Sequence, residues 1–479
     1  MLFSSYIFLF LFLPIVLGCY YLTPKKLKNC FLLIASLLFY SWGVPKLVGV
    51  LVLSSISDYI LAKYFAKNSG VKKCRIAFCL SISINVGLLI YFKYANFFVS
   101  EINTILTYLG NSNIVWTNIM LPIGISFFTF QKISYLIDVY QNRVKPADSL
   151  IDYLLFVSLF PQLIAGPIVK YHDISDQLKS RNHSTALFFS GFVRFSIGLA
   201  KKVLIADTMG SVADNVFNLE YSQMTIFYSW IGLICYSMQI YFDFSGYSDM
   251  AIGLGRLFGF KFQENFNFPY ISKSVTEFWQ RWHISLSTWM KEYLYIPLGG
   301  NRVNATRTYL NLWIVFLISG LWHGASWNFI IWGAFHGLFL SLDRLFLLAI
   351  LKNTHWLFKT ISTYFIVLNS WVLFRAETLD IAIKYYCKMY GLLPNSHSLK
   401  NIYFDQIITN RGLFILTVLM LVTFFFGTSS FKKLRSYFIL DNSTFLKICL
   451  QGSFAILIYI LSVLTLSATD YNPFIYFKF

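Results

Sequence analysis

The stretch VFLISGLWHGASWNFIIWGAFHG, from Val315 to Gly337, is apolar enough to lie in a membrane, yet it carries two histidines. His323 and His336 stand within it, close to Trp322 and Trp327. An ionisable side chain in a spanning segment costs a few kcal/mol unless protein or water solvates it, so such a residue indicates function by default. The rest of the sequence should therefore show whether the chain builds a polar interior around these rings.

The whole chain has the composition of a membrane protein. Of its 479 residues 57% are hydrophobic and only 13% are charged, whereas soluble domains carry about 25% charged residues. A spanning helix needs about 20 apolar residues, and from the recurring apolar runs we expect about 10-12 membrane-embedded helices, some of them short or re-entrant. The clearest runs are Ser5–Leu22, Cys30–Trp42, Leu47–Leu61, Ile76–Phe92, Ile114–Phe130, Ala186–Leu204, Ile226–Phe242, Leu310–Phe329, Ile330–Leu348, Leu357–Phe374, Leu413–Phe426 and Leu446–Leu464.

The net charge of +18 is explained by the membrane and argues against a nucleic-acid partner. The basic residues gather in short loops between apolar runs, which marks those loops as cytoplasmic and leaves Met1 extracytoplasmic. No Lys or Arg precedes the first run, so we expect a retained helix rather than a cleaved signal peptide. The basic groups are Lys25, Lys26 and Lys28; Lys63, Lys67, Lys72, Lys73 and Arg75; Arg302 and Arg307; and Lys432, Lys433 and Arg435.

The middle of the chain differs from its two ends. From about Leu121 to His336 the apolar runs are interrupted by Pro, Gly, Asp, Glu, Arg and His. Irregular or polar backbone at membrane depth is tolerated only where protein buries it or where it lines a water-filled cavity. We therefore predict an all-α integral membrane protein whose helices surround a central tunnel. One polytopic domain is expected over residues 1–479, with a catalytic core at about 121–337.

Two segments before the histidines fit the wall of such a tunnel. In FPQLIAGPIVK (160–170), Pro161, Gly166 and Pro167 break an apolar run, which favours a re-entrant segment over a merely kinked helix. In FDFSGYSDMAIGLGRLFGF (242–260), Asp243 and Asp249 are costly unless they meet a cation or water. A structural role for both aspartates is the favoured interpretation. The glycines of this run do not have the spacing of a dinucleotide fingerprint, and no strand precedes them.

The segment TEFWQRWHISLSTWMKEYLYIPLGG (276–300) contains a further histidine. Glu277 and Arg281 have the i,i+4 spacing of a helical ion pair. His283 lies in the middle, and Ser285 is close enough in sequence to hydrogen-bond its ring. From the residues alone, a structural histidine is as well supported as a functional one.

His323 is the strongest candidate for chemistry. Histidine has an ordinary pKa close to neutrality, so it can take and return a proton, and burial favours the neutral ring of a general base. Gly320 and Gly324 leave space beside it. His336 lies several turns further on and is better explained as a structural or helix-end residue. We expect no metal site, because the chain has no HExxH helix and no Cys/His cluster at metal spacing.

These motifs together resemble the membrane-bound O-acyltransferase family, in particular its bacterial branch that O-acetylates alginate, peptidoglycan or other polysaccharides. The resemblance covers FDFSGYSDMAIGLGRLFGFKFQENFNFPYISKSVTEFWQRWHISLSTWMKEYLYIPLGGNR and SGLWHGASWNFIIWGAFHG, with PIGISFFTFQKISYLIDVY and QLIAGPI before them. It implies that two histidines meet in a tunnel: His283 of RWHISLS and His323 of WHG. It also implies transfer of an acyl group from a thioester donor to a hydroxyl.

In this branch the resemblance implies cytosolic acetyl-CoA as the donor, with no bound cofactor. It also implies a polysaccharide acceptor outside the bacterial cytoplasmic (inner) membrane and an extracytoplasmic esterase-like acetyltransferase as partner. Lys291, Arg302 and Arg307 could attract the donor's phosphates, His323 would be the catalytic base and His283 would orient the donor or stabilise the oxyanion. The expected tunnel lining is Trp279, Arg281, Trp282, Ser285, Ser319, Trp322, Trp327, Asn328, Asp243 and Asp249.

Three alternative functions stay open at this point. The first is D-alanyl transfer to teichoic acid, although the aromatic tail NPFIYFKF (472–479) favours acetyl transfer. The second is a transporter or flippase of envelope precursors, because broken helices and midplane polar residues also mark transport sites. The third is a scaffold for a secretion complex. No pair of matching interrupted segments in two halves supports an inverted repeat.

Overall fold

The computed structural model describes residues 1–43, 45–67, 71–393, 403–426, 445–469, 471 and 473. These residues form helices and no strands, which confirms the predicted all-α fold. Five described helices are long and apolar enough to cross a membrane, and two shorter apolar helices, Ile7–Leu22 and Asn410–Phe424, accompany them. The total of 10-12 embedded helices, which counts short ones, stays a prediction. The five long spans are Pro45–Lys67, Lys72–Tyr108, Trp327–Leu351, Trp356–Arg375 and Phe445–Ala468.

Two sequence features discussed above lie outside the described residues. These are the basic loop with Lys432, Lys433 and Arg435, and the tail NPFIYFKF apart from Pro473.

The chain forms two compact units. It passes between them three times: within α9 (Thr185–Ala200), within α11 (Ile226–Leu257), and between Gln263 and Glu264. The single polytopic domain expected over residues 1–479 stays a prediction. The first unit comprises Met1–Gly191 and Ala251–Gln263, and the second comprises Phe192–Met250 and Glu264–Phe479.

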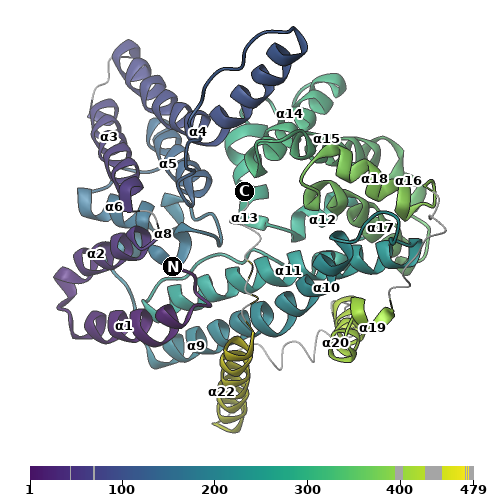
Figure 1. Cartoon of the computed structure of the whole chain (residues 1–479). Helices are drawn as coiled ribbons and strands as arrows, with labels where there is room; N and C mark the ends of the chain where they lie inside the picture. The colour runs from purple at the N-terminus through teal and green to yellow at the C-terminus, as the bar shows by residue number, and fades with distance from the viewer. Residues whose placement is uncertain are drawn as a thin grey trace. The chain divides into compact units, whose positions relative to one another are not determined.

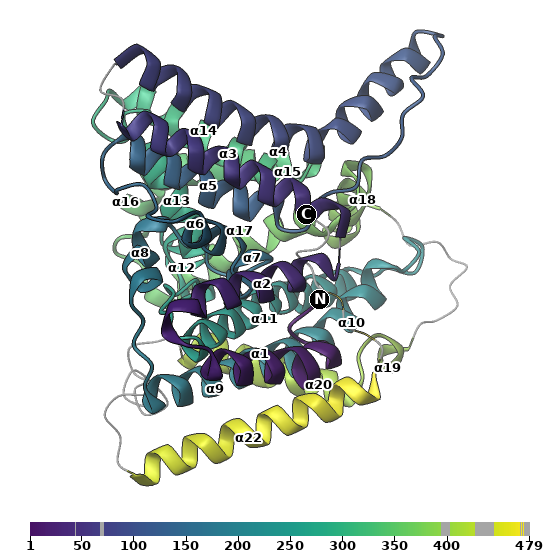
Figure 2. The same ribbon diagram turned by 90° about the vertical axis from the view of Figure 1, so that its left-hand side faces the viewer.

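The first unit is held together by a buried ionic contact between its helices. Lys132 of α5 and Asp58 of α3 are 3.2 Å apart and fully buried, and Asn85 of α4 donates a hydrogen bond of 2.8 Å to the same carboxylate. A buried charge is tolerated only with such partners. Figure 2 shows α3 and α4 lying side by side. The helices of this unit are α1 (Leu13–Leu22), α2 (Lys28–Ser41), α3 (Val48–Lys67), α4 (Val71–Tyr108), α5 (Ile125–Tyr140), α6 (Leu150–Ser158), α7 (Phe160–Leu163) and α8 (Tyr171–Lys179).

One helix predicted for this unit is absent over the first half of its expected range. The apolar run Ile114–Phe130 was expected to be continuous, but residues 112–122 have no regular structure and α5 begins at Ile125. Gly124 caps the helix with φ +75°, a conformation that side chains with a Cβ rarely adopt. A Cβ there would also lie 2.5 Å from the carbonyl oxygen of Leu163. Hydropathy alone does not reveal such a chain reversal.

The predicted interruption at Pro161 is confirmed. After α6 the chain makes only the one-turn helix α7, and residues 164–170 then continue without helical structure although all of them are buried. Whether this segment is re-entrant in a bilayer stays a prediction.

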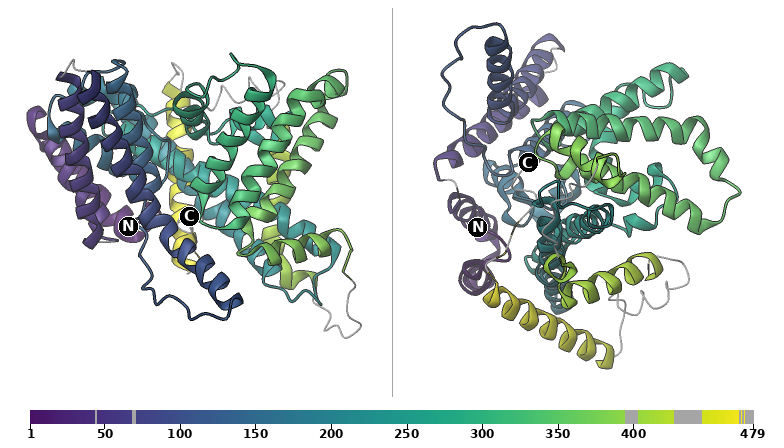
Figure 3. Two further views of the ribbon diagram at one scale, coloured as in Figure 1. Left: turned by 90° about the horizontal axis from the view of Figure 1, so that it is seen from above. Right: turned by 45° about the vertical axis from the view of Figure 1, so that its right-hand side comes forward.

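The second unit carries the two histidine-containing segments that the sequence singled out, 276–300 and 315–337. Its α14 and α15 form the most extensive helix pair among the described residues, and they lie side by side in two views (Figure 1 and Figure 3). Its helices, besides parts of α9 and α11, are α10 (Asp207–Phe217), α12 (Val275–Arg281), α13 (Ile284–Met290), α14 (Ala305–His323), α15 (Trp327–Leu342), α16 (Leu348–Leu351), α17 (Trp356–Arg375), α18 (Leu379–Met389), α19 (Phe404–Ile407), α20 (Asn410–Leu421) and α22 (Phe445–Ala468).

The apolar run Leu310–Phe329 is divided between two helices, so its expected continuity is wrong. The α14 helix ends at His323, Gly324 is extended, and α15 begins at Trp327. His323 and His336 therefore lie on neighbouring helices of a hairpin rather than on one helix. The polypeptide reverses at a glycine because Phe329 packs against it: a Cβ on Gly324 would be 2.2 Å from that ring.

Close contact between α14 and α15 requires glycine at position 333. A Cβ there would lie 2.3 Å from the carbonyl oxygen of Phe316, whereas a Cβ on Gly337, one turn further along, would find its nearest atom at 3.5 Å.

We therefore expect Gly333→Ala to destabilise the protein by about 1–3 kcal/mol through overpacking. Gly337→Ala, the matched control, should be neutral or slightly stabilising. The measurement is the thermal midpoint in detergent, and equal midpoints for the two variants would contradict this packing.

Candidate active site

His283 is held at the junction between two short helices. The α12 helix starts at Ser274, whose hydroxyl accepts a hydrogen bond from the backbone of Glu277, and it ends at Arg281. His283 is the N-cap of α13 and adopts left-handed backbone angles, φ 43° and ψ 54°. A non-glycine residue there stores about 1–3 kcal/mol of strain, and such strain clusters at functional sites. The side chain is completely buried.

Trp322 contacts the rings of both His323 and His283. The ring centroids of His323 and Trp322 are 4.9 Å apart, and those of His283 and Trp322 are 6.0 Å apart. His323 is the last residue of α14 and only 3% of its surface is exposed. The two imidazoles predicted from the motifs are thus both buried in the second unit, with Trp322 in edge contact with each.

Two further aromatic side chains contact His323. Trp332 and Phe374 lie with their ring centroids 4.9 Å and 5.3 Å from it. Trp332 in turn contacts His336 at 4.8 Å. The indole N–H of Trp279 donates a hydrogen bond of 3.3 Å to Nδ1 of His336. His336 therefore lies within the aromatic packing of α12 and α15, in the middle of its helix.

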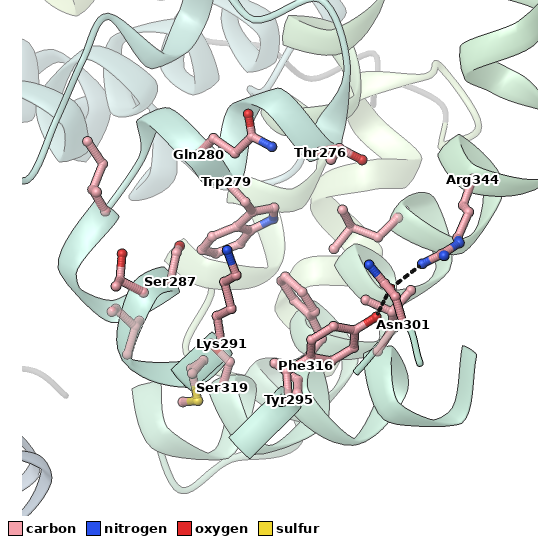
Figure 4. A pocket seen from close by; sticks show the side chains of 17 residues that line it. Thr276, Trp279, Gln280, Ser287, Lys291, Tyr295, Asn301, Phe316, Ser319 and Arg344 are labelled. Atoms are coloured by element: carbon pink, nitrogen blue, oxygen red, sulfur yellow. Dashed lines mark hydrogen bonds between the residues drawn. The ribbon is translucent and has the colours of Figure 1, made fainter. Parts of the chain in front are cut away.

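A pocket of about 460 Å³ opens beside these helices. Its described walls are mostly apolar and include two basic side chains, Lys291 and Arg344, with no acidic one. On one side of the pocket Asn301 accepts hydrogen bonds from the Tyr295 hydroxyl at 2.5 Å and from the Arg344 guanidinium at 2.8 Å (Figure 4). The lining residues are Thr276, Trp279, Gln280, Ile284, Leu286, Ser287, Thr288, Met290, Lys291, Tyr295, Asn301, Leu312, Val315, Phe316, Ser319, Leu340 and Arg344.

The pocket adjoins both histidine-bearing segments, although neither histidine is part of its lining. Ile284, the neighbour of His283, lines it, and so does Ser319, one helical turn before His323. Figure 4 shows Lys291 and Trp279 among the side chains around it. The pocket can hold a largely apolar molecule that carries negative charge, and it adjoins the segments that carry the two histidines.

Other residues expected in the tunnel lining have structural partners. Arg281 pairs with Glu277 at 2.8 Å, as the i,i+4 spacing predicts, and Trp282 stacks on Phe278 with centroids 5.5 Å apart. The amide of Asn328 donates a hydrogen bond of 2.7 Å to the carbonyl of Ala376. Trp327 is 52% exposed. Arg302 and Arg307 are also exposed and lie outside the pocket lining.

Both aspartates of α11 face cations. Asp249 pairs with Arg194 at 2.6 Å and with Lys201 at 2.7 Å. Asp243 pairs with Lys202 at 3.3 Å, and that lysine also pairs with Asp207. Removing one partner of a buried pair costs about 3–5 kcal/mol. These contacts supply the cations that the sequence analysis required for burial of the two carboxylates.

Two residues of this region carried no signal in the sequence. Arg344 lies beyond the expected core, which ends at 337, but a π-helical segment, Asp343–Leu347, continues α15 and brings it to the pocket. Asn265 is 18 positions before His283 in the chain, yet its side chain contacts that ring at 3.1 Å. Among the described residues, no group of His, Cys, Asp and Glu is arranged to hold a metal ion.

Comparison with known proteins places the chain in a family. Residues 147–375 match the model of the membrane-bound O-acyltransferase family. The "Probable alginate O-acetylase AlgI" of Pseudomonas putida is 42% identical over 492 aligned positions that cover 100% of both chains. The "Peptidoglycan O-acetyltransferase" of Helicobacter pylori is 40% identical over 82% of this chain and 80% of its own. The "Teichoic acid D-alanyltransferase" of Bacillus subtilis is 29% identical over 48% of this chain and 60% of its own.

The chain therefore belongs to the membrane-bound O-acyltransferase family, as its motifs predicted.

Proposed function

We propose that this membrane protein transfers an acetyl group from a cytosolic thioester to a hydroxyl of a cell-envelope or secreted polysaccharide. The relatives that match most of the chain are named for alginate and peptidoglycan O-acetylation. The relative named for D-alanyl transfer aligns with less than half of the chain at lower identity. Acetyl transfer is therefore favoured over D-alanyl transfer.

The observation that carries the proposal is the buried His323 at the end of α14, one helical turn after Ser319 of the pocket lining and in contact with Trp322, which also contacts His283. A neutral imidazole in a site without bulk water can remove the proton of a hydroxyl as that oxygen attacks a carbonyl. General-base catalysis contributes about 10²–10⁴-fold. Positioning of the two substrates must supply much of the remaining rate acceleration.

The reaction is an acyl transfer in which one bond forms and one breaks. The acceptor oxygen bonds to the carbonyl carbon of the acetyl thioester while His323 takes the hydroxyl proton. The carbon–sulfur bond then breaks, and the proton passes from the imidazolium to the departing thiolate. The products are an acetyl ester and a free thiol. His283, which also contacts Trp322, orients the donor or stabilises the oxyanion in this scheme.

The pocket supports acetyl-CoA as the donor. Its apolar wall suits the pantetheine arm, and Lys291 and Arg344 suit the phosphates. Arg302 and Arg307 lie outside the lining and would act on the approach of the donor at longer range. Lys291 belongs to the expected set, and we add Arg344 to it because Arg344 lines the pocket.

We infer the orientation of the protein in the membrane from the basic residues of its loops. The basic loop that contains Arg302 and Arg307 belongs on the cytoplasmic side by the positive-inside rule, which places the pocket mouth toward the cytosol. The same rule places the N-terminus outside a bacterial cytoplasmic membrane. The acceptor would then be acetylated on the far side, together with an extracytoplasmic esterase-like acetyltransferase partner that completes transfer to the polymer.

We expect His323→Ala to abolish acetyl-ester formation on the polysaccharide while the protein stays folded and inserted. The loss should be at least the roughly 10²–10⁴-fold contribution of a general base. Acetyl esters are measured by alkaline release from polysaccharide of cells that carry the variant as their sole copy. The control is His355→Asn, which changes an exposed histidine and keeps an acceptor for the backbone N–H of Leu357. Unchanged acetyl-ester content in polysaccharide from His323→Ala cells would refute the catalytic role of this residue.

The donor pocket gives a separate expectation. Lys291→Ala and Arg344→Ala should each raise KM for acetyl-CoA about tenfold, because a hydrogen bond to a charged group contributes about 1.5–3 kcal/mol. Lys273→Ala removes the same charge from an exposed position outside the lining and should change KM less than twofold. Labelled acetyl-CoA consumption in isolated membranes measures this. Equal KM values in all three variants would show that the donor binds elsewhere.

A further inference from the structure

Asn265 holds the segment before α12 against the loop that carries His283. Its side chain is buried. The backbone N–H of Ile284 donates to the Asn265 carbonyl at 2.9 Å, and the backbone N–H of Asn267 donates to the Arg281 carbonyl at 2.9 Å. These two hydrogen bonds fix the chain on either side of His283, whose own backbone is in the left-handed region.

The side-chain oxygen of Asn265 is a hydrogen-bond acceptor shared by His283 and Ser285. It accepts from the backbone N–H of Ser285 at 3.2 Å and from the Ser285 hydroxyl at 2.9 Å, and it lies 3.1 Å from Nδ1 of His283. The amide nitrogen at the other end donates to the Ser248 hydroxyl at 3.1 Å. The amide is thus anchored at both of its ends.

These contacts determine which nitrogen of His283 carries the proton. A backbone N–H can only donate, so the Asn265 atom that faces Ser285 is the carbonyl oxygen and can only accept. Nδ1 of His283, facing the same oxygen, must therefore be the protonated nitrogen of the neutral ring. The alternative, donation from the Ser285 hydroxyl to Nδ1, is longer at 3.4 Å. It would also set the Nδ1 lone pair against the Asn265 oxygen.

We infer that Asn265 is a positioning residue that fixes His283 in the Nδ1–H tautomer and leaves the lone pair on Nε2. This inference rests on the proposed role of His283 in the reaction. It also narrows that role. A neutral ring with its lone pair on Nε2 accepts a hydrogen bond there, so it can bind the hydroxyl hydrogen of the acceptor or an amide hydrogen of the donor. It cannot donate from Nε2 to an oxyanion unless it has first been protonated.

Removal of the acceptor oxygen should lower turnover rather than donor binding. Asn265→Leu keeps the approximate shape of the side chain but cannot accept from Nδ1. We expect kcat for labelled acetyl-CoA in isolated membranes to fall about 10- to 100-fold, the loss typical when the partner that orients a metal-bound histidine is removed. KM for acetyl-CoA should stay within twofold. Asn265→Asp retains an oxygen in the same place and should recover most of kcat.

A double-variant comparison separates positioning from a general structural effect. In the background of His283→Ala, Asn265→Leu should lower kcat by less than twofold further, because the ring that it orients is gone. Asn267→Leu, a matched change at an exposed position two residues away, should keep the wild-type kcat. If Asn265→Leu does not accumulate in membranes, Asn265→Ala serves in its place, since water can then satisfy the backbone of Ser285 without fixing the ring.

Several outcomes would overturn the inference. Wild-type kcat in a folded Asn265→Leu or Asn265→Ala protein would do so, and so would a full additional loss in the His283→Ala background. An equal loss in Asn265→Asp and Asn265→Leu would show that the oxygen does not matter. Wild-type turnover of His283→Ala alone would instead refute the role proposed for that histidine, whatever Asn265 does.

Discussion

A buried polar group needs a partner, and the second unit is arranged around that requirement. The amide of Asn265 satisfies the backbone and hydroxyl of Ser285, the ring of His283 and the hydroxyl of Ser248 at once. Any of these buried groups left without a hydrogen-bond partner would cost about 1–3 kcal/mol of stability. The same rule governs Asp249, which has Arg194 and Lys201 beside it, and Asp58 with Lys132 in the first unit. These buried contacts hold rigid surroundings in which a strained residue such as His283 can persist.

Such fixed surroundings would serve the proposed acyl transfer. The pocket adjoins the segments that carry His283 and His323, its walls are mostly apolar, and in the proposed function its basic groups would neutralise an anionic donor. In such surroundings electrostatic interactions are stronger than in water, and the groups need little reorganisation during the reaction. The proposed acyl transfer from acetyl-CoA would require exclusion of water, because water would otherwise compete with the acceptor hydroxyl for the thioester.

Much of this arrangement could be predicted from the sequence, and the exceptions have physical reasons. Hydropathy identified the membrane fold, and the cost of burying a histidine singled out His323. Helix ends were less well predicted: Gly124 and Gly324 break apolar runs through backbone geometry that hydropathy does not measure. Asn265 and Arg344 were missed because their importance comes from contacts made across many residues of chain. No local sequence pattern around a single asparagine or arginine predicts such a contact.

The most direct test of the account is a structure of the protein in lipid with a non-reactive acetyl-CoA analogue in which a methylene group replaces the thioester sulfur. The account predicts the phosphates of the analogue beside Lys291 and Arg344. It also predicts the carbonyl next to His323, so that an attacking hydroxyl could hydrogen-bond to that ring within about 2.6–3.2 Å. An analogue bound with its carbonyl remote from both His323 and His283 would contradict it.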